Sequence, residues 1–295
     1  MNRSRHDREA ALLEDALTVL FCLVDDLYQN INPNGRRYES LKKLSDSEVI
    51  TLALFQQLRG MESQRSFLRD ASRFFSHLFP GVVGLALSSL HRRTRKLRGF
   101  LEPLRRSVLT DLVGEPETLL IDSTLLSVLH PRQVGQSTGI AGAAWVRWGS
   151  FCVYGVKLPM LCATNRVPIS YELTPPNVVE AGLTHELLDE ANLANEPARK
   201  LLGHLAYRSE RLKESLVEVG VLLATEQADR RCGRRQQVEI AFSSLKRVFR
   251  LGETLATTLV GLATRIAAKM TAYTYAFMVN RMLGRPQGRI KELWA

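Results

Sequence analysis

The stretch TLLIDSTLLSV, residues 118–128, decides how the second part of this chain folds. It is a continuous apolar run that is broken by one acid, Asp122. A run of this length and composition predicts a buried strand. Burying a carboxylate costs free energy unless a partner compensates for it. A metal ion, an arginine or a structural hydrogen-bond network could each be that partner, and the stretch alone does not choose among them.

The chain on the C-terminal side of this strand alternates between strand and helix patterns. It predicts the order β-β-β-α-β-α-β-α, which belongs to the mixed α/β class. The expected strands are 118–128, 150–164, 167–175, 198–205 and 220–225, and the expected helices are 177–192, one from Ser209, 234–250 and 257–283. The glycine-rich segment 130–150, which contains Trp145 and Trp148, is expected to be a surface loop. These tryptophans could pack internally or stack on unpaired bases, and we make no choice between the two.

The first third of the chain is predicted to be helical. Residues 9–29 place leucines and valines on one side of a helix, and Ser45 with Glu48 fits a capping box that opens another. Residues 62–78 form a further helical pattern, which Pro80-Gly81 stops. The following segment is rich in basic residues, including Arg92, Arg93, Arg95 and Lys96. We divide the chain into a helical region (1–114) with a possible helix-turn-helix, a mixed α/β domain (115–283) and a C-terminal tail (284–295).

Composition favours a soluble protein that meets a polyanion. The 295 residues carry a net charge of +10, and the pI is near 9.7. Nucleic acid is the leading partner for such a chain, and the alternative for the basic segment is a solvated helix. The four cysteines form no CxxC pair, which argues against a zinc site or a disulfide framework. The acidic residues near the start argue against a signal peptide, so we expect a cytoplasmic protein without a membrane partner.

The predicted helix at 234–250 carries a narrow charged stripe. At about 100° per residue, Arg235, Glu239 and Lys246 fall within about 40° of one another. An apolar stripe beside them must face the core. The stripe could be ordinary charge pairing on a solvated helix, since Arg235 and Glu239 have i,i+4 spacing. It could also place a carboxylate with two cations at a functional site.

Together, four stretches resemble the DDE transposases of bacterial insertion sequences: LLIDSTLLSV, YGVKLPMLCATNRVPISYELTPPNVVEA, the strand before AYRSE, and RRQQVEIAFSSLKRVFRL. The likeness is to the large insertion-sequence-four-like clan, whose catalytic domain has a ribonuclease H-like fold. It covers about residues 40–282 and is strongest over 118–282. Its most specific element is the pattern R-x3-E-x6-K, which Arg235, Glu239 and Lys246 meet. The family often has a tyrosine three residues before that arginine, where this chain has Cys232.

The resemblance implies three catalytic, metal-ligating positions: Asp122, position 204 and Glu239. The family has aspartate at the second of these, within motifs such as GD.AY, whereas this chain reads GHLAY and has His204. The family's chemistry uses two Mg²⁺ ions about 4 Å apart. Mg²⁺ prefers carboxylate oxygens and water, while a neutral imidazole binds Mn²⁺, Zn²⁺ or Fe²⁺ better.

Three interpretations of His204 follow. The histidine could be a damaging substitution, which we favour and which predicts lost or strongly reduced activity. It could be a working ligand that shifts metal preference from Mg²⁺ to Mn²⁺. It could also be structural, with another acid serving instead, for which Asp189, Glu196 and Glu210 are nearest in sequence.

The resemblance implies a transposase that binds the terminal inverted repeats of its element, cleaves DNA and joins it to target DNA, as a homodimer on DNA. The resemblance makes residues 1–114 the DNA-binding region and residues 115–283 the ribonuclease H-like catalytic domain. Arg235 and Lys246 would contact phosphates near the cleaved bond, and Arg92, Arg93, Arg95 and Lys96 would contact the terminal repeats. Such a protein works in the bacterial cytoplasm at the nucleoid. Two alternatives are a non-catalytic DNA-binding remnant that competes with active copies and a stand-alone ribonuclease H-like nuclease.

Overall fold

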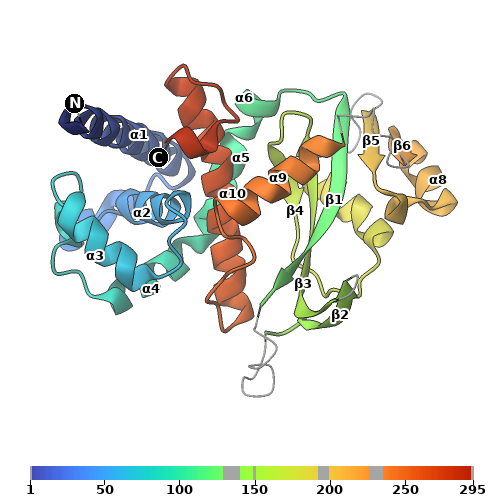
Figure 1. The fold of residues 1–295 in the computed structure, drawn as a ribbon, viewed down its shortest axis with the longest axis horizontal. Coiled ribbons are helices and arrows are strands. Elements are labelled where there is room, and N and C mark those ends of the chain that lie inside the picture. The colour runs from blue at the N-terminus through green and yellow to red at the C-terminus, as the bar shows by residue number, and fades with distance from the viewer. Residues whose placement is uncertain (1, 129–139, 149–150, 192–198, 226–234, 294–295) are drawn as a thin grey trace. The chain divides into compact units, whose positions relative to one another are not determined.

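The computed structural model describes residues 2–128, 140–148, 151–191, 199–225 and 235–293 (Figure 1). The chain divides into two compact units. Unit 1 contains Met1–Val108, Val248–Arg250 and Thr264–Ala295, and unit 2 contains Leu109–Arg247 and Leu251–Ala263. None of the described helices has both the length and the apolar character that crossing a bilayer requires.

Unit 1 is helical, as its sequence predicts. Its helices are α1 (Asn2–Ile31), α2 (Asp46–Leu58), α3 (Gln64–Phe74), α4 (Leu87–Leu97), α5 (Leu101–Ser107) and most of α10 (Leu259–Met282), with short 3-10 turns at Gly35–Leu41, Pro80–Val82, Arg98–Phe100 and Ile290–Leu293. The predicted capping box is confirmed: the Ser45 side chain accepts from the N–H of Glu48, and the Glu48 carboxylate accepts from the N–H of Ser45. This reciprocal bonding fixes where α2 begins.

A buried ion-pair cluster joins α10 to the chain between α2 and α3 inside unit 1. The ammonium of Lys269, which is fully buried, pairs with Glu62 and donates to the carbonyl of Phe249 at 2.5 Å. The guanidinium of Arg265 lies 3.1 Å from the same carboxylate. Burial lowers the pKa of Lys269, and the charge of Glu62 opposes that shift. The cluster is therefore fully paired but expensive to break.

Lys269→Met tests this cluster. We expect it to lower the free energy of unfolding by about 3 kcal/mol, because Glu62 loses its buried partner. Denaturant unfolding followed by circular dichroism measures the change. The matched control is Lys213→Met, whose lysine is more than half exposed and pairs only loosely with Glu210. A loss below about 1 kcal/mol for Lys269→Met would mean that the cluster contributes no more than a surface pair.

Unit 2 is built on a mixed six-stranded sheet. The strands are β1 (Thr118–Ser127), β2 (Ala144–Trp148), β3 (Phe151–Ala163), β4 (Pro168–Tyr171), β5 (Arg199–Gly203) and β6 (Val221–Thr225). Their order is β2-β3-β1-β5-β6, and β4 pairs with β3. Strand β1 runs antiparallel to β3 and parallel to β5. The predicted mixed α/β class, with helices first and a mixed sheet after them, is confirmed.

The prediction that 130–150 is a loop is wrong for its last part. Residues 144–148 form β2, which pairs antiparallel with the start of β3 and places Trp145 opposite Tyr154. Aromatic and β-branched residues in AWVRW favour a strand, and the cross-strand aromatic contact supports it. Gly155 permits the close approach of β3 to β1, because a Cβ there would lie 2.1 Å from the Leu126 carbonyl. Residues 129–139 lie outside the described part of the chain.

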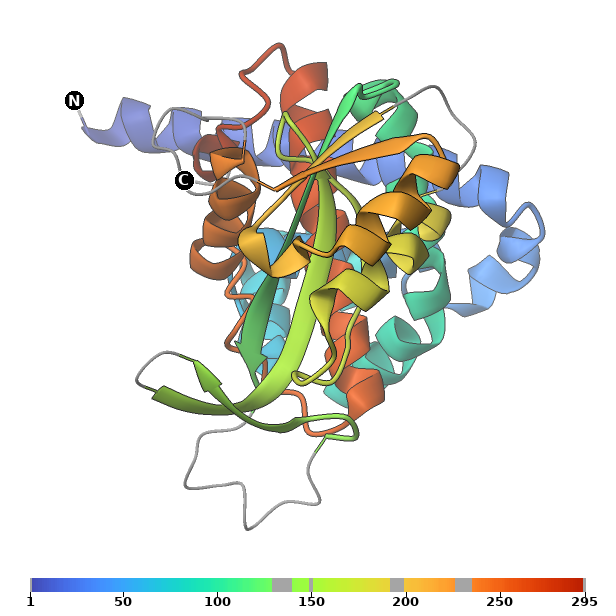
Figure 2. The same cartoon turned by 90° about the vertical axis from the view of Figure 1, so that its right-hand side faces the viewer.

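Helices cover the sheet of unit 2. Helices α7 (Thr184–Glu190) and α8 (Glu210–Glu218) lie on one face, where their leucines join Leu119, Ile121 and Leu201 in an apolar core (Figure 2). Helix α9 (Gln236–Arg247) contacts β1, with Val238, Phe242 and Leu245 buried (Figure 1). A short helix, α6 (Leu109–Val113), precedes β1, and 3-10 turns form at Glu180–Leu183 and Leu205–Tyr207.

Candidate active site

Asp122 lies in the middle of β1, the strand that pairs with both β3 and β5. Successive side chains of a strand point to opposite faces. Ile121 belongs to the core under α7 and α8, so Asp122 points to the other face. Helix α9 contacts β1, and the charges of Glu239 on α9 and of Arg235 directly before it act on Asp122. The strand and the helix thus bring together two residues that are far apart in sequence.

Helix α9 presents its charged stripe toward Asp122. The Arg235 guanidinium lies 2.8 Å from the carboxylate of Glu239, so the predicted i,i+4 pair forms. The Glu239 side chain is 49% exposed, whereas that of Arg235 is 16% exposed. Lys246 is exposed overall, but partial burial lowers the pKa of its amino group and the charge of Asp122 opposes that shift. Both cations of the stripe therefore act on Asp122.

The surroundings of Asp122 disfavour the ionised form of its carboxylate. Burial raises its pKa above the usual range, and the charges of Glu180 and Glu239 raise it further. The N–H of Ser123, which donates to Oδ1 at 2.8 Å, and the charge of Arg235 lower it again without cancelling the rise. A cation bound at this carboxylate would relieve the remaining repulsion.

His204 lies beside Asp122 in the register of the sheet. Strands β1 and β5 pair up to Ile121 and Gly203, and Asp122 and His204 are the next residues of each. The histidine is exposed, and its Nδ1 accepts from the N–H of Ala206 at 3.3 Å, capping the turn Leu205–Tyr207. The backbone of residue 204 is thus next to Asp122 in register, while the imidazole of His204 is hydrogen-bonded within its own loop.

The donor set fits a divalent cation in part. Asp122 and Glu239 offer two carboxylates within electrostatic range of each other, which is the ligand chemistry that Mg²⁺ and Mn²⁺ prefer. Within the described residues, no three His, Cys, Asp or Glu side chains are grouped closely enough to hold a metal ion. His204 does not complete such a group in this structure. Its assignment as a metal ligand stays a prediction.

The other acids considered for position 204 lie elsewhere. Asp189 is exposed near the end of α7, and Glu210 is exposed at the start of α8. These two helices cover the face of the sheet opposite Asp122. Glu196 and Cys232 lie outside the described residues.

Four further residues near Asp122 escaped the sequence analysis. Lys157 of β3, Glu180 and Ser123 form a polar chain beside Asp122, and Tyr207 is buried close by. Burial raises the pKa of the Tyr207 hydroxyl, as do the charges of Glu180 and Asp122. Gly203 admits this ring, since a Cβ there would lie 3.2 Å from Tyr207. One signal was available: Lys157, like Asp122, is a charge inside an apolar strand.

The basic segment of unit 1 divides into exposed and engaged residues. Arg92, Arg95 and Lys96 are exposed on or next to the last turns of α4. Arg93 instead donates to the Leu44 carbonyl at 2.6 Å and pairs with Asp46 at 2.6 Å. Its side chain is 19% exposed, so Arg93 has a structural function in unit 1.

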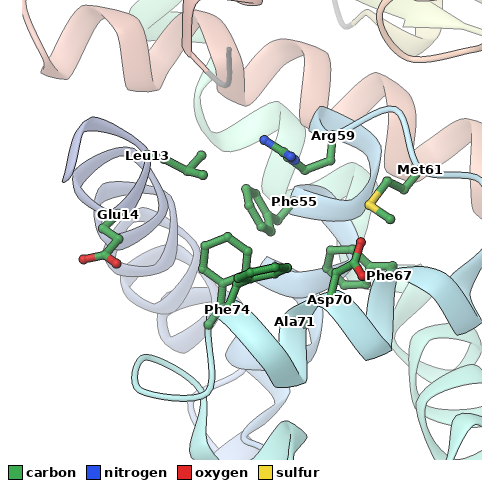
Figure 3. A pocket seen from close by; sticks show the side chains of 10 residues that line it. Leu13, Glu14, Phe55, Arg59, Met61, Phe67, Asp70, Ala71 and Phe74 are labelled. Carbon is green, nitrogen blue, oxygen red and sulfur yellow. The ribbon is translucent and has the colours of Figure 1, made fainter. Parts of the chain in front are cut away.

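Unit 1 also contains an apolar cavity of about 340 Å³ (Figure 3). Phe55, Phe67 and Phe74 line it together with Leu13 and Met61. Its polar lining consists of the carboxylates of Glu14 and Asp70 and the guanidinium of Arg59. A mostly apolar cavity with more negative than positive charge does not suit the DNA backbone.

Comparison with known proteins identifies the family. The family model described as "Transposase DDE domain" matches residues 114–275, more than half of the chain, so the chain belongs to this family of divalent-metal-dependent proteins. A comparison with curated proteins gives no match.

Two solved structures are similar to the chain. A piggyBac transposase synaptic complex with hairpin DNA is 12% identical, with a TM-score of 0.47, covering 94% of this chain and 78% of that chain. A Mos1 transposase paired-end complex with the left transposon end is 13% identical, with a TM-score of 0.27, covering 80% of this chain and 78% of that chain. The helices and mixed sheet described above are consistent with a ribonuclease H-like transposase fold.

Asp122→Asn tests the electrostatics of this site. A raised pKa means that the folded chain holds the Asp122 proton more tightly than the unfolded chain. Its contribution to stability therefore falls as pH rises through that range, and ionisation costs folding free energy at pH 7. We expect Asp122→Asn to raise the melting temperature by a few degrees at pH 7 and by less near pH 4. Glu239→Gln is the control, because Glu239 is half exposed and paired; equal gains for both variants would contradict the assignment.

Proposed function

We propose that this chain is an insertion-sequence transposase that binds the ends of its element, cleaves them and transfers the strand to target DNA. The observation that carries the proposal is the placement of Asp122 on the central strand, within reach of the charges of Glu239 and Lys246 on α9 and of Arg235 directly before it. The family match over residues 114–275 supports it.

The proposed chemistry assigns a role to each of these residues. Asp122 and Glu239 would hold Mg²⁺, with Mn²⁺ as the alternative, and His204 would be the third ligand position. Bound cations would activate the attacking oxygen and stabilise the leaving 3′-oxygen. Arg235 and Lys246 would contact phosphates beside the cleaved bond and so position the strand. Cleavage would break one P–O3′ bond with water as the nucleophile and free a 3′-hydroxyl. In transfer, this hydroxyl would attack a phosphate of the target DNA, and the new P–O bond would form as the P–O3′ bond of the target strand breaks.

The proposal includes the DNA partner and the assembly. Both similar structures are transposases with DNA, one in a synaptic complex with hairpin DNA and one in a paired-end complex with the left transposon end. By analogy, we propose a homodimer on double-stranded DNA, with Arg92, Arg95 and Lys96 contacting the terminal inverted repeats. We place the protein in the cytoplasm of a bacterium, at the nucleoid.

A second candidate function is a DNA-binding remnant without catalytic activity. The ring of His204 is bonded to its own loop and supplies no carboxylate beside Asp122. Such a protein would still occupy element ends and compete with active copies. The two candidates differ only in catalysis.

Restoring the carboxylate separates the two. We expect His204→Asp to raise cleavage of a labelled duplex carrying the element's end by at least about tenfold in Mg²⁺, because carboxylate oxygen is the better Mg²⁺ ligand. In Mn²⁺, the natural chain and His204→Asp should differ less in cleavage than they do in Mg²⁺. Glu239→Ala is the blank. Equal cleavage by the natural chain and by His204→Asp would show that histidine is a working ligand. Failure of both to cleave while both bind the end would favour the remnant.

DNA binding by α4 has its own test. We expect Arg92→Ala with Lys96→Ala to weaken binding of a mixed-sequence duplex and to reduce the slope of log K against log salt by about 0.9 per lost phosphate contact. Fluorescence anisotropy at several salt concentrations gives both values. Arg93→Ala is the matched control: it should lower the melting temperature instead, because it breaks the contacts to Leu44 and Asp46. An unchanged slope in the double variant would remove α4 from the DNA interface.

A further inference from the structure

A chain of polar contacts leads from β3 to the Asp122 carboxylate. Lys157 donates to the carbonyl of Val178 at 2.9 Å and lies 3.5 Å from Oε1 of Glu180. The same Oε1 accepts from the hydroxyl of Ser123 at 2.5 Å. The N–H of Ser123 donates to Oδ1 of Asp122 at 2.8 Å. Two side chains, of Glu180 and Ser123, and the N–H of Ser123 thus connect a lysine on one strand to an aspartate on its neighbour.

Stability alone does not explain why these polar contacts are buried. The side chains of Lys157 and Glu180 are only 12% and 15% exposed. A partly buried ion pair of this kind gains little over apolar residues of the same volume. The presence of this ion pair beside an apolar strand is better explained by the residues that it holds in place.

The contacts support β1 on the side where its pairing with β5 ends, while its pairing with β3 continues. The ladder between β1 and β5 ends at the pair Ile121–Gly203. Asp122 and Ser123 follow that pair, so on this side they have no hydrogen-bonded neighbour strand among the described residues. Instead, the Glu180 carboxylate accepts a hydrogen bond from the Ser123 hydroxyl, and the N–H of Ser123 donates to Asp122 and orients its carboxylate.

The charge of Glu180 also reaches Asp122. It is one of the causes that raise the pKa of Asp122, although Ser123 and Asp122 point to opposite faces of β1. A negative charge that disfavours ionised Asp122 favours a cation bound there by the same interaction. Mutation of residues that hydrogen-bond to a metal ligand and orient it commonly changes metal affinity by about 10–100-fold.

We propose that Glu180 is a positioning residue for a divalent cation at Asp122, acting through Ser123 and through its own negative charge. The inference rests on the metal site of the proposed function. It concerns this protein in particular, because His204 brings no carboxylate to the site. Glu180 would supply part of the missing negative charge from the opposite face of β1. Glu180 is not a ligand in this account, since its Oε1 accepts from Ser123 and lies 3.5 Å from Lys157 on the opposite face of β1 from Asp122.

Mn²⁺ titration of the full-length protein, followed by the electron paramagnetic resonance of free Mn²⁺, tests the inference without requiring activity. Glu180→Gln keeps an oxygen for Ser123 and removes the charge, while Ser123→Ala keeps the charge and removes the contact. We expect Glu180→Gln to weaken Mn²⁺ binding about tenfold and Ser123→Ala to weaken it by less. Glu210→Gln is the matched control, because it removes one exposed carboxylate from the same unit. Melting curves show that each variant is folded.

The binding results of these variants decide whether the inference holds. Weaker binding by Glu180→Gln and by Asp122→Asn, with Glu210→Gln unchanged, supports the inference. Weaker binding by Asp122→Asn alone overturns it and leaves the metal site of the proposed function standing. Unchanged binding by Asp122→Asn overturns the metal site and, with it, the role of Glu180. If Glu180→Gln does not fold, Ser123→Ala decides instead, and unchanged binding by that variant overturns the inference.

Discussion

Burial of the Asp122 carboxylate on a strand of leucine and isoleucine is the constraint on which the arrangement of unit 2 depends. Burial and two neighbouring acids raise its pKa, and the charges of Arg235 and Lys246 compensate only in part. Folding stability alone would favour an apolar residue at this position. A site that sacrifices stability in this way is typical of a position kept for function.

The alternation of β1 lets one strand serve both the core and the site. Leu119 and Ile121 pack under α7 and α8, while Asp122 points to the other face. The parallel register with β5 then brings position 204 next to Asp122 without any dedicated contact between them. Substitution of the residue at 204 can therefore change the chemistry of the site while the sheet remains intact.

The parts of the site with a local signal could be predicted from sequence. Asp122 interrupts an apolar strand and Glu239 shares a helical stripe with two cations, so strand and helix periodicity were enough to find them. Glu180 could not be found, because its significance comes from a hydrogen bond to a residue 57 positions away. Strand β2 was missed because glycines before it outweighed the strand-forming residues of AWVRW. Arg93 was grouped with its exposed neighbours because sequence does not show that Asp46 lies beside it.

The central claim is that Asp122 and Glu239 together hold a divalent cation. Anomalous diffraction from crystals of the protein soaked in Mn²⁺ tests it most directly, because it locates the ion without relying on catalysis. The account predicts a Mn²⁺ peak between these two carboxylates that is lost in Asp122→Asn crystals. A fully soaked crystal with no peak there, or with Mn²⁺ bound only at other carboxylates, would contradict it.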